Sequence, residues 1–139
     1  MFLYAVGREH LYKDPCRTIM GLLAGGELSG EVSVALLQEH AHVVLRQEGD
    51  RSRALAQTRR ITEICHVLDF ARRDADRALQ LLGRYRRLDA QDAVHAATAL
   101  NRGIGSIISP ERGFDDVARL ERVDPADLER VFELAGRGS

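Results

Sequence analysis

The chain has 139 residues, of which 45% are hydrophobic and 29% are charged, and its formal net charge is −1. A chain of this length and composition can bury a core and form a globular domain. The net charge excludes a protein that is basic overall, so any contact with nucleic acid requires a local basic patch.

The cysteines and the apolar segments limit the class of protein and its location. Cys16 and Cys65 lie far apart and have no CxxC spacing, which argues against a zinc site or a redox pair. No apolar run approaches the roughly 18 residues of a membrane span. The start, MFLYAVGREH, does not have the charge order of a secretory signal. We therefore expect a cytoplasmic protein that does not enter the membrane.

Glycines, prolines and capping residues divide the chain into short apolar segments and longer amphipathic ones. The expected strands cover residues 2–6, 30–34, 66–70 and 106–109. The expected helices cover residues 14–26, 33–49, 50–65, 74–85, 89–100 and 124–134. All six ranges begin at an acid or a serine, and Asp14, Ser33, Asp74 and Asp124 are among the expected helix starts. Residues 110–116 are expected to form a loop.

The order of these segments predicts the fold class. Helices alternate with short β-branched strands that lack an in-and-out alternation of polar residues. This pattern is typical of a parallel sheet covered by helices on both faces, the α/β class. The sequence contains no repeat or linker, so a single domain over residues 1–139 is expected.

Acidic residues lie near expected strand ends and helix starts in three separate stretches. Glu39 follows the second strand, Asp92 lies in the first turn of an alanine-rich helix, and Glu111 and Asp115 follow the strand 106–109. Ligands of open α/β sheets bind beyond the carboxyl ends of the strands. Carboxylate oxygens suit Mg²⁺, and a cluster of them can hold ions that activate water against a phosphodiester.

Each acid also has a purely structural interpretation. Asp89 and Asp92 have the spacing of a capping box at a helix start. Glu39 can be a solvated acid on a helix surface, and the acids between Glu111 and Asp116 can cap a short turn. Spacing alone therefore proposes a cluster of carboxylates without establishing it.

Three stretches together resemble the signature of PIN-domain proteins, and more narrowly of VapC-type toxins. They read SVALLQEHAHVV, LDAQDAVHAATALNRG and IISPERGFDDV, and they occur in this order. The resemblance extends from Phe2 to about Pro125. It implies a Rossmann-like α/β fold and an endoribonuclease that depends on Mg²⁺ or Mn²⁺.

The resemblance also implies roles for individual residues. Glu39, Asp92 and Glu111 match the metal-binding acids, and Asp115 is a further candidate. Ser109 matches a Ser/Thr position that helps to orient the loop or a metal-bound water. VapC toxins typically cut structured RNA such as tRNA or rRNA, commonly form homodimers, and are inhibited by a VapB antitoxin. We expect the same substrate class and partners here.

Two departures from the family pattern bear on activity. The family more often has Asp at the position of Glu111, so this carboxylate reaches about one methylene further, which Mg²⁺ tolerates poorly. The family's first strand normally begins with a metal-binding Asp, whereas this chain begins MFLYAVG. One hypothesis is a start codon further upstream that restores this Asp. A protein made from Met1 is expected to bind Mg²⁺ poorly.

The missing acid leaves an alternative function open: a catalytically weakened PIN fold that binds RNA or antitoxin. For an RNA substrate, basic side chains near the second and third helices are the first candidates for phosphate contact. These candidates are Arg46, Arg51, Arg53, Arg59 and Arg60. A second basic run, which contains Arg84, Arg86 and Arg87, supplies further candidates for phosphate contact. Solvated helix faces would also explain both runs.

Overall fold

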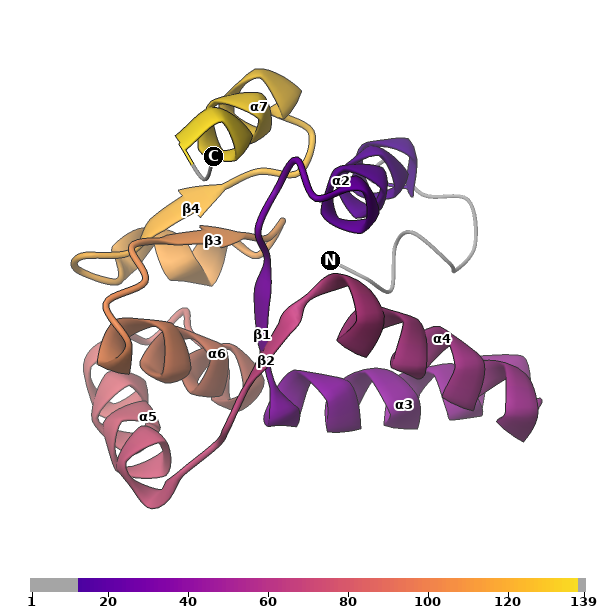
Figure 1. Ribbon diagram of the computed structural model, residues 1–139. Coiled ribbons are helices and arrows are strands. Elements are labelled where there is room, and N and C mark those ends of the chain that lie inside the picture. Colours follow the sequence, from indigo (N-terminus) through magenta and orange to yellow (C-terminus); the bar gives the residue numbers. More distant parts are fainter. Residues whose placement is uncertain (1–12, 138–139) are drawn as a thin grey trace. The chain divides into compact units, whose positions relative to one another are not determined.

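The computed structural model describes residues 13–137, and their elements are drawn in Figure 1. The chain divides into two compact units, of which the first contains residues 1–68 and 125–139 and the second residues 69–124. The positions of the units relative to each other are not determined, so each is described by itself. The strand expected at residues 2–6 lies outside the described residues.

The first unit contains two parallel strands and, among the described residues, four helices. The strands are β1 (Glu31–Ser33) and β2 (His66–Leu68), and the helices are α2 (Lys13–Gly25), α3 (Val34–Glu48), α4 (Arg51–Ile64) and α7 (Leu128–Arg137). Val32 of β1 lies opposite Val67 of β2 in the parallel register. The α3–α4 pair, which packs side by side, lies between the two strands in the chain (Figure 1). The predicted parallel pairing is therefore present in this unit.

Local signals explain the α3–α4 pair. The Ser33 hydroxyl accepts a hydrogen bond from the Leu36 amide at 3.2 Å, so this serine is the predicted N-cap of α3. Gly49 ends α3 in a left-handed conformation with φ of 69°, which glycine adopts without steric cost. Asp50 then caps α4 by accepting from the Arg53 amide at 3.1 Å. Two residues thus suffice to reverse the chain.

A buried histidine joins the two helices. His40 of α3 is only 4% exposed, and its Nδ1 lies 3.0 Å from the Thr58 hydroxyl of α4. That hydroxyl donates to the Ala54 carbonyl oxygen at 3.0 Å, so it accepts from the imidazole N–H. Burial lowers the pKa of His40 below its ordinary value, which favours the neutral ring.

The second unit contains a helix pair followed by two parallel strands. Its elements are α5 (Arg72–Arg84), α6 (Ala90–Asn101), β3 (Ser106–Ile108), the 3₁₀ helix η1 (Arg112–Asp116) and β4 (Glu121–Val123). The strands β3 and β4 pair in parallel, with Ile107 opposite Arg122. Small side chains let α6 pack closely, since Ala93, Ala96 and Ala97 are fully buried. These alanines share one core with Phe114 of η1 and with residues of α5.

A buried ion pair joins the start of α5 to the end of α6. The Asp74 side chain is fully buried and accepts hydrogen bonds from the Ala71 amide, the Asn101 side chain and the Arg102 guanidinium at 2.8 to 3.1 Å. Arg102 also donates to the carbonyl oxygen of Asp69 at 2.6 Å. Donation by Arg102 holds the pKa of Asp74 far below its usual range, in spite of its burial.

Two predicted helix starts were wrong by a few residues, and each error has a local cause. In α2, whose described part begins at Lys13, Asp14 lies in the first turn. Ala71 precedes α5, and Asp74 is the third helical residue, whose carboxylate accepts from the Ala71 amide. The last helix begins at Leu128, where Asp127 instead of Asp124 accepts from the Arg130 amide.

The region after β3 is also more ordered than the predicted loop. It contains η1 and the strand β4, which the sequence patterns did not indicate. The fold class agrees with the prediction, because helices alternate with strands that pair in parallel. Among the described residues, no helix is both long and apolar enough to cross a membrane.

Candidate functional site

Asp92 lies in the first turn of α6, at a helix start that is locally well defined. The Asp89 side chain accepts a hydrogen bond from the Asp92 amide at 2.8 Å. Asp89 is therefore the N-cap, and the cap fixes the backbone that carries the Asp92 side chain. Beyond this turn the alanine face of α6 enters the core. An acid at the first turn is also favoured by the helix dipole.

Glu111 follows the end of β3 and is exposed. Its amide donates to the Ser109 hydroxyl at 3.1 Å, and Ser109 itself is 8% exposed. The amide of Ser109 in turn donates to the Val123 carbonyl oxygen of β4 at 3.0 Å. Ser109 thus connects the loop that carries Glu111 to the β3–β4 pair.

Gly113 brings the backbone of η1 against the segment that leads into α6. A Cβ atom on Gly113 would overlap with the Arg87 carbonyl oxygen and would crowd the Leu88 backbone. Only glycine fits this contact, since it has no side chain. The segments that carry Glu111 and Asp92 are therefore joined within the second unit.

A salt bridge reinforces the same contact. The Arg87 guanidinium donates to both carboxylate oxygens of Asp116, at 2.8 and 3.0 Å, and also contacts the Arg112 carbonyl oxygen at 3.5 Å. Both side chains of the ion pair are exposed. The hydrogen bond from Arg87 holds the pKa of the Asp116 carboxyl below its usual value.

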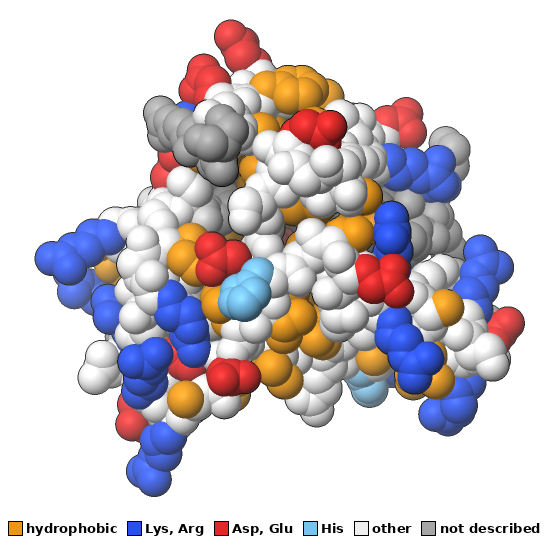
Figure 2. Space-filling view, in the orientation of Figure 1, with side chains coloured by type: hydrophobic (Ala, Val, Ile, Leu, Met, Phe, Trp, Pro, Cys, Tyr) orange, Lys and Arg blue, Asp and Glu red, His pale blue; other side chains and the backbone are white. Residues whose placement is uncertain are grey.

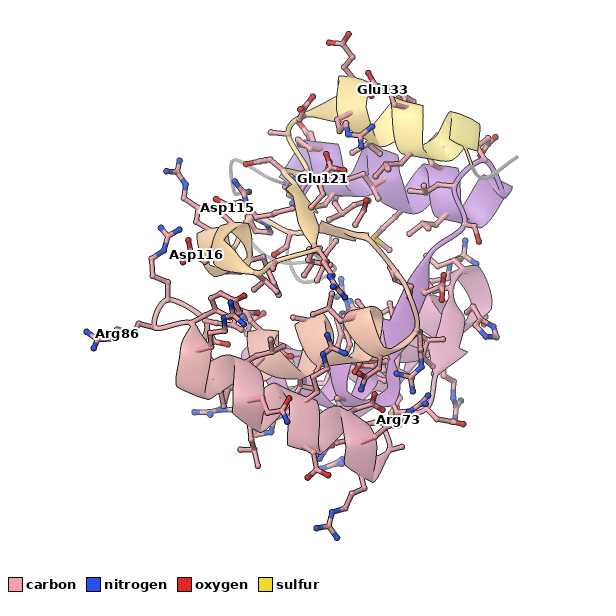
Figure 3. All side chains as sticks on the ribbon, turned by 90° about the vertical axis from the view of Figure 1, so that its left-hand side faces the viewer. Arg73, Arg86, Asp115, Asp116, Glu121 and Glu133 are labelled. Carbon is pink, nitrogen blue, oxygen red and sulfur yellow. The ribbon has the colours of Figure 1, made fainter. Side chains whose placement is uncertain are left out.

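Asp115, the additional metal-ligand candidate, lies beside an arginine. Arg122 of β4 donates to the Asp115 carboxylate at 2.7 Å and to the Ser109 carbonyl oxygen at 3.1 Å, and it lies 3.5 Å from Asp124. Its side chain is 14% exposed. Figure 3 shows Asp115 and Asp116 side by side on η1. The Asp115 carboxylate is thus already engaged by a cation of the protein.

Glu39 lies on α3 in the first unit, half-buried, next to His40. The structure therefore places one predicted ligand in the first unit and three in the second. Among residues 13–137, no three His, Cys, Asp or Glu side chains are grouped as a metal site would need. What the structure joins are the segments of Asp92 and Glu111.

Comparison with known proteins identifies the family of this chain. The family model described as "PIN domain" matches residues 2–120. Ribonuclease VapC7 of Mycobacterium tuberculosis is 31% identical over 138 residues, which cover 98% of this chain and 94% of the relative. Ribonuclease VapC13 of the same organism is 32% identical over 124 residues, covering 87% of this chain and 92% of the relative, and a VapC ribonuclease of Mycobacterium bovis matches equally well. The chain is a PIN-domain protein of the VapC group.

The donor chemistry of this PIN-domain protein suits a hard divalent cation. Asp92 and Glu111 supply carboxylate oxygens, which Mg²⁺ and Mn²⁺ prefer to nitrogen or sulfur ligands. The close approach at Gly113 supports their joint use, because it fixes the two segments against each other. Asp115 fits less well, since a metal ion would have to compete with the guanidinium of Arg122.

The first run of predicted RNA contacts of the PIN domain lies on the first unit, and the run at residues 84–87 lies on the second. Arg46 is near the end of α3, and the other four candidates of the first run are exposed on α4. Arg60 forms an ion pair with Glu63 at 3.2 Å. The sequence did not indicate the roles of Arg87 and Arg122, because their partners lie in other elements that only the fold brings close.

Proposed function

We propose that this PIN-domain protein is an endoribonuclease toxin that depends on Mg²⁺ or Mn²⁺ and cleaves structured RNA such as tRNA or rRNA. The observation that carries the enzyme class is the match over 98% of the chain to a relative named as a ribonuclease. The acids Asp92 and Glu111, held in adjoining segments, supply the chemistry that the class requires.

We assign metal binding to Asp92 and Glu111 of the second unit, and Glu39 of the first unit stays a predicted ligand on the resemblance to VapC toxins. When bound, the ion would lower the pKa of a water molecule and stabilise charge on the phosphodiester oxygens. Hydrogen bonds of neighbouring residues hold two of these acids in place. Asp89 fixes the backbone of Asp92, and Ser109 fixes the backbone of Glu111. Asp115 serves this site indirectly, by holding Arg122 against the loop.

The proposed partner is a VapB-type antitoxin, and the proposed assembly is a homodimer. The partner is supported by membership of the VapC group, whose toxins are named for pairing with VapB proteins. The homodimer is proposed from the resemblance to VapC toxins, which commonly dimerise. Co-expression of the chain with the product of a small neighbouring gene tests the partner directly. Co-purification of the two proteins and loss of RNA cleavage would support it.

An RNA- or antitoxin-binding module without cleavage is the second candidate function. It is favoured because, within residues 13–137, no three His, Cys, Asp or Glu side chains lie close enough together to hold a metal ion. The two candidates differ in one measurement, because only the enzyme shortens RNA when a divalent cation is added.

The decisive experiment is cleavage of total tRNA and rRNA with Mg²⁺ and with EDTA. The wild-type protein should cut only with the metal. Asp92→Asn should lower the rate by about two orders of magnitude or more, because it removes a charged ligand. Asp115→Asn should cost less than about tenfold, since Asp115 is paired with Arg122.

Asp116→Asn is the matched control, because it removes a neighbouring carboxylate that pairs with Arg87 outside the metal ligands. The enzyme proposal fails if wild-type protein gives the same RNA pattern with Mg²⁺ and with EDTA. The ligand assignment fails if Asp92→Asn cuts as fast as the wild-type protein.

A further inference from the structure

Three segments of the second unit meet at the end where the predicted ligands Asp92 and Glu111 lie. Residues 84–87 and η1 are joined by the Arg87–Asp116 ion pair and by the close approach of Gly113. The Tyr85 hydroxyl accepts a hydrogen bond from the Ala118 amide at 3.3 Å, which attaches the segment after η1. Contacts in the structure thus bring together residues 84–87, 112–116 and 118–119.

Besides Arg87, these segments carry four exposed arginines, Arg84, Arg86, Arg112 and Arg119, which we call the arginine rim. Among the described residues, none of the four guanidinium groups has an ion-pair partner. Figure 3 shows Arg86 extending away from the ribbon. In Figure 2, basic side chains project at several places along the edge of the view, with acidic side chains among them. The Arg84 guanidinium lies 5.5 Å from the centre of the Tyr85 ring.

Two acids next to the rim are paired with arginines outside it. Asp115 is held by Arg122 and Asp116 by Arg87, so both of these charges are already balanced. The four rim arginines lie in the segments next to the predicted metal ligands Asp92 and Glu111. Clustered guanidinium groups attract and orient phosphate groups.

The backbone at Arg119 gives a second indication. Its φ is 68°, and it is the only residue other than glycine with a positive φ among those the structure describes. This conformation strains an arginine and would suit glycine. Strained residues persist mainly where their side chain has a use. Here the side chain adds positive charge to the rim.

We propose that the arginine rim binds the phosphate backbone of RNA and positions it beside the acids of the second unit, while Arg87 and Arg122 are structural. The inference rests on the proposed ribonuclease function. Guanidinium groups pair with phosphate oxygens through two hydrogen bonds, and such contacts carry no sequence information. The rim should therefore bind unrelated RNAs of equal length similarly.

The chemistry of the rim favours RNA over a protein partner. A protein interface needs buried apolar or aromatic anchors at its centre. The large apolar side chains that are exposed among the described residues are Val34, Leu55, Phe70, Leu79 and Phe132. None of them belongs to the three segments of the rim. A surface that is rich in arginine and lacks exposed apolar side chains suits contact with a phosphate backbone.

The test compares two triple variants with equal charge changes. The rim variant is Arg86→Gln, Arg112→Gln and Arg119→Gln. The control variant is Arg17→Gln, Arg72→Gln and Arg73→Gln, which removes three exposed charges from α2 and α5, outside both predicted RNA-binding runs. Arg84 is left intact because it stacks on Tyr85. Binding of labelled tRNA is followed by anisotropy in EDTA, which prevents cleavage, over a series of salt concentrations.

We expect the rim variant to bind tRNA about tenfold or more weakly than wild type. The slope of log affinity against log salt should fall by about 0.7 to 0.9 for each lost phosphate contact. The control variant should change both quantities much less. An unrelated RNA of equal length should give the same ratio between wild type and rim variant. Unchanged thermal unfolding of both variants would show that they fold.

Three results would overturn the inference. Equal weakening by both variants would show a bulk charge effect. Unchanged tRNA binding and cleavage by the rim variant would remove the rim from RNA recognition while leaving the ribonuclease function intact. Unchanged RNA binding with loss of a co-expressed antitoxin would assign the rim to a protein partner. If wild-type protein binds RNA through the rim but never cuts it, the proposed enzyme fails and the rim stands.

Discussion

Asp74 and Asp116 both pair with an arginine, and their different burial gives the two pairs different energetic weight. The Asp74 side chain is fully buried and accepts four hydrogen bonds, whereas 41% of the Asp116 side chain is exposed. Solvent screens an exposed pair and solvates either partner once the other is removed. A buried arginine that loses its partner has no such compensation.

Substitution Asp74→Asn should therefore destabilise the protein strongly. We expect a loss of about 3 kcal/mol or more, because Arg102 would stay partly buried beside a neutral group. Urea denaturation measures the change. Asp116→Asn is the control and should leave the midpoint nearly unchanged. Similar midpoints for the two variants would contradict the prediction that the buried ion pair contributes more stability than the exposed one.

The depressed pKa of Asp74 also fixes the sign of a pH effect. The carboxylate is favoured in the folded state, so its contribution is complete above its unfolded pKa of about 3.9. It is lost as the pH falls below that value. Wild-type protein should therefore lose more stability than Asp74→Asn on acidification through this range.

At the scale of elements, the candidate site depends on the contact between η1 and the segment that precedes α6. Gly113 meets the Arg87 carbonyl oxygen, a backbone atom that cannot move aside as a flexible side chain would. Gly83 near the end of α5 has open space around it and an ordinary helical backbone. The same substitution to alanine can therefore be compared at a crowded position, Gly113, and at an open one, Gly83.

We predict that Gly113→Ala separates η1 from α6. The overlap should cost about 1 to 3 kcal/mol of stability. RNA cleavage should fall as well, because Glu111 moves relative to Asp92. Gly83→Ala should instead stabilise the protein by up to about 1 kcal/mol, since alanine is the better helix former. Thermal unfolding and a cleavage assay of both variants check the prediction, and full activity in Gly113→Ala would refute it.

Elements were predictable from the sequence where a local signal decides them. The Ser33 cap, the stop at Gly49 and the Asp89 cap are set by residues within three or four positions, and all three are present. The strand β4 was missed, because three residues pairing with β3 leave no periodic pattern. Capping positions near several acids were misplaced, as at Asp124, where Asp127 competes for the same role.

The candidate site was predictable in its residue types and less so in its contacts. Motif resemblance nominated Glu39, Asp92 and Glu111 as ligands, and this assignment remains a prediction. The sequence did not show that Arg122 engages Asp115, because that ion pair exists only once β4 lies beside η1. Such ion pairs form between residues of different elements, so spacing alone does not reveal them.

At the scale of the whole molecule, the net charge of −1 does not show which arginines are paired with acids and which are not. Some arginines neutralise acids that would otherwise add to the site, as Arg87 and Arg122 do. Others, such as Arg86, have no ion-pair partner among the described residues and extend into solvent (Figure 3). A nearly neutral protein can in this way present a phosphate-binding surface beside metal-binding acids.

Metal binding should be visible in the stability of the whole protein. A ligand that binds only the folded state stabilises it by RT ln(1 + [L]/Kd), about 2.7 kcal/mol at a concentration 100 times Kd. Because weak Mg²⁺ binding is expected of this chain, the metal must be added well above Kd. At such concentrations Mg²⁺ or Mn²⁺ should raise the melting temperature of the wild-type protein, and EDTA should reverse the change. A buffer without divalent cations, adjusted to the same ionic strength, controls for general salt effects.

The same measurement tests each proposed ligand separately and needs no RNA. Glu39→Gln and Asp92→Asn should each abolish most of the metal-induced shift, because each removes a charged oxygen ligand. Asp115→Asn should retain the shift, since its carboxylate is held by Arg122. A shift that survives in Asp92→Asn would exclude that residue as a ligand. Loss of the shift in Asp115→Asn would instead mean that the cation displaces Arg122 and binds Asp115 directly.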